Sequence, residues 1–477
     1  MKNRLLLFLF LLPLLWIGTS NSHDWGDDFS QYLLQAKNLA QDRPQTNQEL
    51  VFAEGELPYA IVAYPVGFPI LLALFFDYFG LYIPPYLLLN AFFIILTTLF
   101  LFDYLKRSFD IKYSFLIAIF FAYNLIPLVL KKEILSEFPF TLLLFSILLL
   151  IKSDRRKSFA FAGLLAGFMI SIRVSGIVIL PALFGWYLMT QRQFPLKKRL
   201  VDCAVFSALA VTVFYLLNVA LFEIDLKNFL GFYADQFESN RLMLPSNFFS
   251  FFQKTGEAIF PPLQSTLWTI LLMIIILTGF YKKFKEGGLA EWFFIFYLLL
   301  IIVYPYASSG LRFIYPVLPF LIIYLVKGIQ TIYQFITSKE KSFQLLTIIF
   351  SVSIFLSFRL FFSLPTPDGP YSTDAHSALN HIRTNTPENA IVLFSRARAL
   401  NLYAERKSTF LIQHKSEQEN LAILKKLQCD YILYADERSG AFNQSLQDFL
   451  IINKSDYDTI YKVDRFLLLK MKTEDRQ

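Results

Sequence analysis

The chain has 477 residues, of which 55% are hydrophobic and only 17% are charged, and it carries 54 phenylalanines. About a quarter of the residues in a soluble domain are charged, so this composition excludes an ordinary soluble protein. The net charge of +7 comes from lysine and arginine clusters between apolar runs, which set membrane topology. We expect no nucleic-acid partner, because no soluble segment has a basic stripe with interleaved aromatic residues.

Apolar runs follow one another through the first 360 or so residues. A transmembrane helix needs about 20 apolar residues, and the runs predict a polytopic α-helical membrane protein with about eleven transmembrane helices. Their predicted centres lie near residues 12, 96, 121, 144, 167, 183, 211, 272, 297, 320 and 351. The first run, Leu5 to Gly18, has the shape of a signal peptide, but we expect it to remain as a span.

The distribution of positive charge predicts the orientation of these spans. Short connections rich in Lys and Arg alternate with longer or less basic ones at 21–85, 131–137, 223–262 and 305–312. The positive-inside rule places the N-terminus in the cytoplasm, and an odd number of spans places the C-terminus outside.

Three apolar stretches are irregular. Ala160–Tyr187 is too long for one helix and is broken around Arg173, so we expect two spans joined by a tight outer turn. Val66–Phe79 and residues 246–262 are expected to form helices along the membrane surface rather than across it.

The composition changes after about Leu364, where Pro365 to Pro370 forms a linker. Strand-like segments at 390–394, 408–412, 430–434, 459–462 and 466–469 alternate with helical segments at 373–384, 396–404, 417–427 and 445–452. The alternation predicts a small α/β domain. The predicted domains are therefore 1–363, a transmembrane domain with a long first outer loop at 21–85, and 364–477, an α/β domain outside the membrane.

Asp27 and Asp28 stand at the outer mouth of the first span. Ionisable groups at a membrane boundary are costly to desolvate and mark functional sites. One of them could act as a general base while the other tunes its pKa. The alternative is that they cap a helix beginning near Phe29.

Other charged residues are predicted at the same outer face. Glu137 could orient an acceptor, or it could be a solvated loop end. Lys131 and Lys132 break the positive-inside pattern, which suggests attraction to phosphate or is a tolerated exception to the rule. Arg173 and Arg312 lie at the outer ends of spans, where guanidinium groups bind phosphate or extend to the interface.

Several familiar signals are absent from the sequence. There is no phosphate-binding P-loop and no glycine-rich dinucleotide fingerprint. The four histidines, His23, His376, His381 and His414, show no metal-ligand spacing. No soluble cytoplasmic segment is large enough to bind a nucleotide sugar, so an energised donor would have to be linked to a lipid.

Four sequence pieces together resemble a known family: Gly26 to Ala40 followed by Tyr64 to Ala73, Ser136 to Phe140, Gly163 to Pro181, and Arg312 to Pro319. They resemble the GT-C superfamily of membrane glycosyltransferases. The most similar branch contains the protein O-mannosyltransferases and the bacterial enzyme that adds aminoarabinose to lipid A.

The resemblance implies a catalytic acid in the first outer loop, in an Asp-x-x-x-Tyr setting. Only Asp28 has a tyrosine, Tyr32, four residues later, which makes Asp28 the leading base and Asp27 the second candidate. An acidic partner commonly follows the catalytic Asp in the family, but here Phe29 follows. Tyr32 and Tyr315 are candidate acceptor contacts. Some branches use a divalent cation, but no complete metal site is recognisable.

The resemblance thus implies transfer of a hexosyl or pentosyl group from a polyprenyl-phosphate donor to a lipid, glycan or protein acceptor outside a bacterial plasma membrane. Arg173, Arg312, Lys131 and Lys132 would bind the donor phosphate, and Glu137 would orient the acceptor. The alternative is a non-enzymatic transporter or flippase of a lipid-linked glycan, which predicts polar groups deep within several helices. A polymerase or ligase of surface polysaccharide, with a long-chain donor, is a third reading.

Overall fold

The computed structural model describes residues 2–47, 49–52, 63–151, 156–227, 229–231, 234, 244–261, 265–303, 307–334, 339–367, 369–412 and 415–472. Parts of the predicted outer loops, and His414, lie outside these residues. The chain divides into two compact units. The helical unit comprises Met1–Thr19, Pro65–Phe68 and Tyr86–Pro365, and the mixed unit comprises Ser20–Tyr64, Pro69–Pro85 and Thr366–Gln477.

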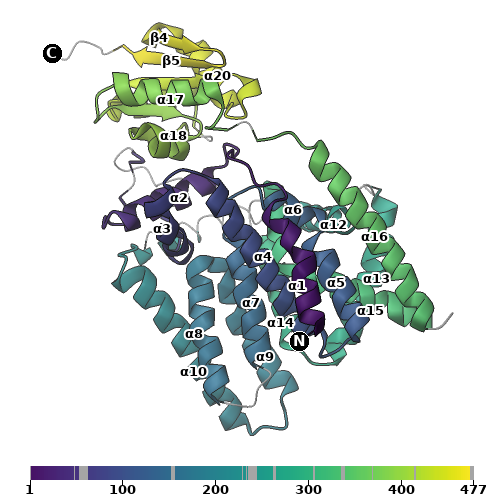
Figure 1. The fold of residues 1–477 in the computed structure, drawn as a ribbon. Coiled ribbons are helices and arrows are strands. Elements are labelled where there is room, and N and C mark those ends of the chain that lie inside the picture. The colour runs from purple at the N-terminus through teal and green to yellow at the C-terminus, as the bar shows by residue number, and fades with distance from the viewer. Residues whose placement is uncertain are drawn as a thin grey trace. The chain divides into compact units, whose positions relative to one another are not determined.

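The helical unit is built from apolar helices (Figure 1). They are α1 (Lys2–Leu11), α4 (Pro84–Leu105), α5 (Ile111–Ala122), α6 (Leu125–Leu130), α7 (Glu137–Ile151), α8 (Arg156–Ile172), α9 (Ile179–Thr190), α10 (Leu196–Tyr215), α12 (Leu244–Ile259), α13 (Thr266–Lys285), α14 (Leu289–Val303), α15 (Leu318–Gln334) and α16 (Lys339–Ser363).

Six helical stretches of the described residues are long and apolar enough to cross a membrane: Pro84–Leu105, Ile111–Leu130, Leu196–Ala220, Thr266–Lys285, Leu311–Gln334 and Lys341–Ser363. Five shorter apolar helices accompany them: Gly67–Phe79, Glu137–Ile151, Lys157–Ile172, Val174–Thr190 and Leu289–Val303. The predicted helical membrane architecture is therefore confirmed, whereas the count of about eleven spans stays a prediction.

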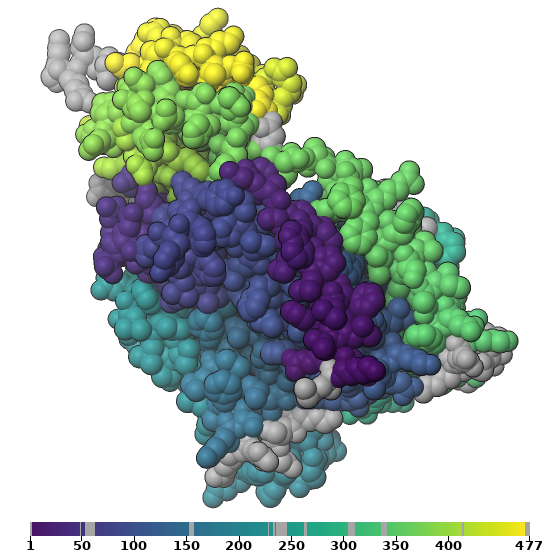
Figure 2. All heavy atoms as spheres, in the orientation of Figure 1, coloured from purple at the N-terminus to yellow at the C-terminus, as the bar shows by residue number. Residues whose placement is uncertain are grey.

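Burial separates central from peripheral helices in this unit. Of the most apolar part of Leu311–Gln334, 89% is buried within the protein. For Leu196–Ala220 this share is only 17%. Figure 2 shows α1 on an open face of the unit, where Leu5 and Phe10 are 60% and 53% exposed. Such extensive apolar exposure fits surfaces that face lipid.

The predicted break within Ala160–Tyr187 falls at Arg173. Helix α8 ends at Ile172, and Arg173 has the extended backbone angles φ −147° and ψ 129°. A 3₁₀ turn, Val174–Val178, then leads into α9. The two predicted surface segments are also helical, as α3 (Gly67–Phe79) and α12; their position along the membrane surface stays a prediction.

Glycines allow helices α13 and α15 to approach closely. A Cβ added at Gly279 would lie 1.8 Å from the carbonyl oxygen of Tyr324, and one at Gly328 would lie 2.0 Å from that of Ile275. Small residues at helix contacts are a general means of packing membrane helices.

We expect Gly279→Ala to force α13 and α15 apart and to lower the free energy of unfolding by about 1–3 kcal/mol, the usual cost of overpacking. Thermal unfolding of the detergent-solubilised protein measures the effect. Gly231→Ala is the control, because a Cβ there meets no atom of the described residues within 4 Å. Equal unfolding temperatures for the two variants would contradict the close packing.

The mixed unit has a five-stranded sheet in the order β2-β1-β3-β5-β4 (Figure 1). The strands are β1 (Ile391–Phe394), β2 (Lys407–Thr409), β3 (Tyr431–Ala435), β4 (Tyr457–Val463) and β5 (Phe466–Met471). Strand β1 pairs in parallel with β2 and β3, and β5 pairs antiparallel with β3 and β4. The strand-like and helix-like segments predicted after Leu364 are all found.

The helices cover both faces of this sheet. They are α17 (Thr373–Asn385), α18 (Ala397–Ala404), α19 (Glu417–Lys426) and α20 (Gln444–Ile452). Alternation along β1 explains the two layers: Val392 and Phe394 pack in one core with α17 and α18, and Leu393 packs in the other with α19 and α20.

The first outer loop contributes to the same unit. Trp25 is buried in the core with α17 and α18, its ring centroid lies 5.7 Å from that of Phe394, and its indole N–H donates to the carbonyl of Ser439 at 2.8 Å. Helix α2 (Asp27–Ala40) follows directly and contacts α18. Trp25 thus anchors the start of α2 on C-terminal residues.

An ion pair stabilises the mixed unit. Arg465 donates to both carboxylate oxygens of Asp374, at 2.5 and 2.7 Å. These hydrogen bonds lower the pKa of Asp374 to about 2, against 3.8 for the free side chain. Because the folded-state pKa lies below the unfolded value, the pair contributes its stability above about pH 4 and loses it as the pH falls towards 2.

We expect Asp374→Asn to destabilise the protein by about 2 kcal/mol at pH 7. The difference from the unchanged protein should shrink between pH 4 and pH 2, where the native carboxylate becomes protonated. Unfolding midpoints measured across this range check the prediction. A difference that stays constant down to pH 2 would contradict the ion-pair origin of the effect.

Candidate functional site

Glu137, Arg173 and Arg312 form one cluster in the helical unit. Glu137 is the first residue of α7 and is fully buried. One of its carboxylate oxygens, Oε1, accepts from Nη1 of Arg173 at 2.8 Å and from Nε of Arg312. The break after α8 presents Arg173, and the 3₁₀ helix Ala307–Val317 presents Arg312.

This cluster carries more positive than negative charge. Two guanidinium groups face one carboxylate, and the arginine side chains are 13% and 19% exposed. Within the described residues, Oε2 of Glu137 is buried and has no hydrogen-bond partner. Guanidinium groups in such an arrangement can bind an anionic group such as phosphate through paired N–H donors.

Lys131 and Lys132 make contacts with other residues than this cluster. Lys131 is fully buried and donates to the carbonyl of Ile17 at 2.5 Å and to the Thr19 hydroxyl at 3.2 Å. Burial lowers the pKa of this ammonium to about 8. Lys132 lies 4.2 Å from the ring centroid of Phe361. These contacts account for both cations structurally, and their binding of phosphate stays a prediction.

Tyr315 is fully buried and packs against α7, the helix that begins with Glu137. Its ring packs 5.0 Å from that of Phe138, the residue after Glu137. Its hydroxyl has no hydrogen-bond partner among the residues that the structure describes. Contact of Tyr315 with an acceptor stays a prediction.

Asp28 belongs to a second cluster, in the mixed unit. The hydroxyl of Tyr64 donates to Oδ1 of Asp28 at 2.5 Å, and Nη1 of Arg398 donates to the same hydroxyl at 3.0 Å. The ring of Tyr32 lies 5.0 Å from that of Tyr64. Gln35 fixes Tyr64 by bonding both its backbone N–H, at 3.0 Å, and its carbonyl, at 2.9 Å.

The two adjacent carboxylates have different surroundings. Burial raises the pKa of Asp27, although Arg398 and Arg396 oppose this effect. In the described part of the chain, Oδ1 of Asp27 is buried without a hydrogen-bond partner, whereas Asp28 accepts from Tyr64.

Asp27 and Asp28 do not cap α2 in the way that the sequence suggested. Helix α2 begins at Asp27 rather than near Phe29, and its N-cap is Gly26, which makes no side-chain cap hydrogen bond. Both carboxylates therefore lie in the first turn, where the helix dipole favours negative charge.

Sequence reasoning missed Arg398 altogether. It lies on α18 and is only 8% exposed, in the mainly apolar helix Ala397–Ala404. An arginine within a short apolar helix is a usable signal for a buried partner, but its target is 334 residues away in the sequence. Tyr64 lies within one of the four sequence pieces that carry the family resemblance, but no sequence pattern predicts its contact with Asp28.

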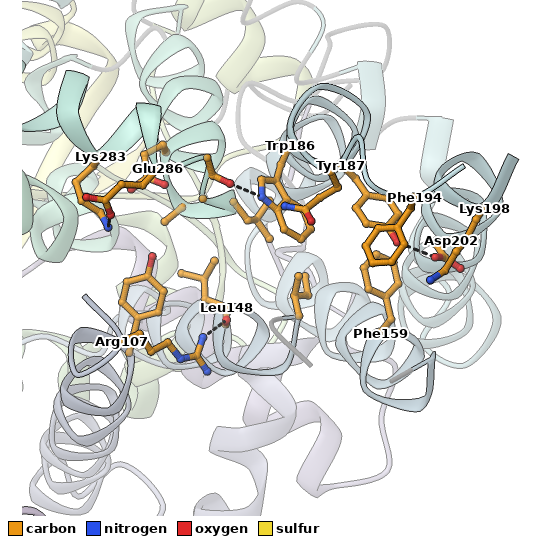
Figure 3. A pocket seen from close by; sticks show the side chains of 18 of the residues that line it. Arg107, Leu148, Phe159, Trp186, Tyr187, Phe194, Lys198, Asp202, Lys283 and Glu286 are labelled. Atoms are coloured by element: carbon orange, nitrogen blue, oxygen red, sulfur yellow. Dashed lines mark hydrogen bonds and ion pairs between the residues drawn. The ribbon is translucent and has the colours of Figure 1, made fainter. Parts of the chain in front are cut away.

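A cavity of about 560 Å³ lies at the other end of α7 from Glu137 (Figure 3). Its lining includes Leu148 and Ile151, at the end of that helix. Arg107 lines it too and donates to the carbonyls of Leu148 and Leu149 at 3.1 and 2.9 Å. At 1.5 Å per residue, α7 separates this cavity from Glu137 by about 20 Å, so it is distinct from the candidate site.

Within the described residues, no group of three or more His, Cys, Asp or Glu side chains could hold a metal ion. Asp27 and Asp28 have arginine and tyrosine neighbours instead. We therefore derive no step through a divalent cation.

Comparisons with known proteins agree with the resemblance drawn from the motifs. The family model for dolichyl-phosphate-mannose-protein mannosyltransferase matches residues 63–217. No curated protein gave a significant match.

Solved structures share the fold at low sequence identity. ArnT from Cupriavidus metallidurans, bound to undecaprenyl phosphate, has 12% identity and a TM-score of 0.60, over 98% of this chain and 97% of that one. AglB, an archaeal oligosaccharyltransferase from Archaeoglobus fulgidus, was solved with an inhibitory peptide and a dolichol-phosphate. It has 12% identity and a TM-score of 0.58, over 91% of this chain and 69% of that one.

The mycobacterial arabinofuranosyltransferase AftD also matches, with 12% identity and a TM-score of 0.54, over all of this chain and 40% of that one. All three relatives are GT-C glycosyltransferases. The chain therefore shares the fold of these membrane glycosyltransferases, and its residues 63–217 match the mannosyltransferase family model.

Proposed function

We propose that this protein transfers a hexosyl or pentosyl group from a polyprenyl-phosphate-linked donor to a lipid, glycan or protein acceptor on the extracytoplasmic face of a bacterial plasma membrane. The observation that carries the proposal is the hydrogen-bonded chain from Arg398 through Tyr64 to Asp28. The undecaprenyl phosphate bound to ArnT and the dolichol-phosphate bound to AglB support the class of donor.

The proposed reaction is a displacement at the anomeric carbon of the donor sugar. The acceptor oxygen forms a bond to this carbon and gives its proton to the Asp28 carboxylate. The bond from the anomeric carbon to the phosphate oxygen breaks, and its electron pair stays on the phosphate. Arg173 and Arg312 stabilise the growing phosphate charge, since fixed donors act most strongly where charge develops.

Tyr64 and Arg398 act on the base rather than on the substrate. The Tyr64 hydroxyl donates to Oδ1 of Asp28 and so fixes the orientation of the carboxylate that is to receive the proton. Arg398 fixes the tyrosine and supplies positive charge near both carboxylates. A positioned general base contributes about 10²–10⁴-fold to a rate, provided that it stays ionised and aligned.

We expect Arg398→Gln to reduce kcat by about 10- to 100-fold, because a charge-assisted hydrogen bond contributes about 1.5–3 kcal/mol. The pH at which half of the activity is lost should rise, since the positive charge that favours the ionised form of Asp28 is removed. Rates measured from pH 5 to pH 8 check both effects. Arg383→Gln, at an exposed position of α17, is the control. An unchanged pH profile would contradict a role for Arg398 in positioning the base.

A transfer assay tests the function itself. Membranes that contain the protein are incubated with labelled polyprenyl-phosphate sugars and, separately, with labelled nucleotide sugars. We expect label to reach an acceptor only from the lipid-phosphate donors. Transfer from nucleotide sugars alone, or movement of the intact donor across the membrane without transfer, would overturn the proposal.

A further inference from the structure

A small cavity in the mixed unit lies close to Asp27 and Asp28. Its volume is about 290 Å³, and its lining residues are Asp24, Trp25, Gly26, Arg396, Arg438, Ser439 and Gly440. Three of them directly precede Asp27 in the chain. Because consecutive Cα atoms are about 3.8 Å apart, the Cα atoms of Gly26 and Asp28 are within about 7 Å of each other. A group held in this cavity would thus be close to the proposed base.

The carboxylate among the lining residues is already satisfied. Oδ1 of Asp24 accepts from the backbone N–H of Gly26 at 2.9 Å and lies 3.0 Å from Nδ1 of His23. Its negative charge is therefore partly compensated within the protein.

The two lining arginines, Arg396 and Arg438, differ in their partners. The Nε of Arg396 is buried and has no hydrogen-bond acceptor among the described residues. Arg438 has a side chain that is 77% exposed and pairs with Asp436 at 2.7 Å. Arg396 thus brings an unsatisfied donor to the wall of the cavity, and Arg438 brings an exposed guanidinium that is paired with Asp436.

We propose that this cavity binds an oxyanion, a phosphate or a carboxylate, carried by the acceptor. Guanidinium groups match both oxyanions through paired N–H donors. The volume lies at the lower end for ligand pockets, so it suits one charged head group or sugar rather than a whole lipid. The inference rests on the proposed function, because it names the class of acceptor on which Asp28 acts. The alternative is a pair of arginines that only meet solvent.

Binding can be tested without turnover. The probe is inorganic phosphate, titrated by calorimetry into the full-length protein in detergent, with acetate and sulfate as separate arms. We expect Arg396→Gln to weaken the phosphate affinity at least 10-fold and Arg438→Gln to weaken it less. Arg383→Gln is the matched control on the same unit and should bind as the unchanged protein does. Equal affinities for the Arg396 and Arg383 variants would overturn the site.

The acceptor role needs a second readout. In the transfer assay with the unchanged protein, phosphate should compete with the acceptor and raise the KM for the acceptor. In Arg396→Gln, phosphate should no longer raise this KM. Binding at Arg396 without competition would overturn the assignment to the acceptor. A protein that binds phosphate at Arg396 but transfers no sugar would instead refute the proposed function, so the two failures are distinguishable. Stronger competition by acetate than by phosphate would identify a carboxylate-bearing acceptor.

Discussion

Asp28→Asn is expected to reduce the rate of sugar transfer by about 10²–10⁴-fold, the contribution of a positioned general base. The amide keeps the shape of the side chain and can still accept the Tyr64 hydrogen bond, but it cannot take a proton. The fold and donor binding should therefore persist. Single-turnover transfer from a labelled polyprenyl-phosphate sugar measures the chemical step apart from product release.

Asp27→Asn provides the matched comparison, because the two residues are neighbours in the first turn of α2. Burial raises the pKa of Asp27, and in the proposed mechanism this residue only tunes the site, so its loss should reduce the rate less than the loss of Asp28 does. A larger defect for Asp27→Asn would exchange the roles of the two residues. Full activity in Asp28→Asn would refute the base assignment.

The second large effect is expected at Glu137. Replacing it with Gln removes the buried carboxylate that both Arg173 and Arg312 contact. Removing one partner of a buried ion pair costs about 3–5 kcal/mol. We expect Glu137→Gln to lower the free energy of unfolding by about this amount, and to weaken donor binding because the arginines lose their alignment.

Denaturation of the detergent-solubilised protein measures the loss, with Glu257→Gln as the control. Glu257 pairs with Lys254 at 3.0 Å on the same helix, and their side chains are 18% and 35% exposed. Such a pair contributes about 0–1 kcal/mol, so the control should lose little stability. Equal losses in both variants would contradict the buried network.

The sequence predicted those parts of the fold that depend on local pattern. Run length and charge bias predicted the membrane helices, and the short alternating segments after Leu364 predicted the sheet and its helices. The break at Arg173 followed from one charged residue within an apolar run. In each case the determining residues are close together in the chain.

The sites could be predicted only in part, because their geometry depends on distant residues. Glu137, Arg173 and Arg312 were assigned to the same face, but no pattern indicated that both arginines would bind one oxygen of Glu137. Neither the insertion of Trp25 beside Phe394 nor the approach of Arg398 to Tyr64 leaves a periodic signal. Such contacts depend on tertiary packing rather than on local propensity.

The burial of Trp25 among C-terminal residues has a consequence for biogenesis. The indole and its acceptor, the Ser439 carbonyl, are 414 residues apart in the sequence. The ribosome must therefore synthesise the chain as far as Ser439 before the start of α2 can form its native contacts. Contacts of such high sequence separation form late, since a long loop must close first. The proposed catalytic carboxylate would therefore be aligned only after Ser439 has been synthesised, and we expect a shorter nascent chain to be inactive on lipid-linked sugars.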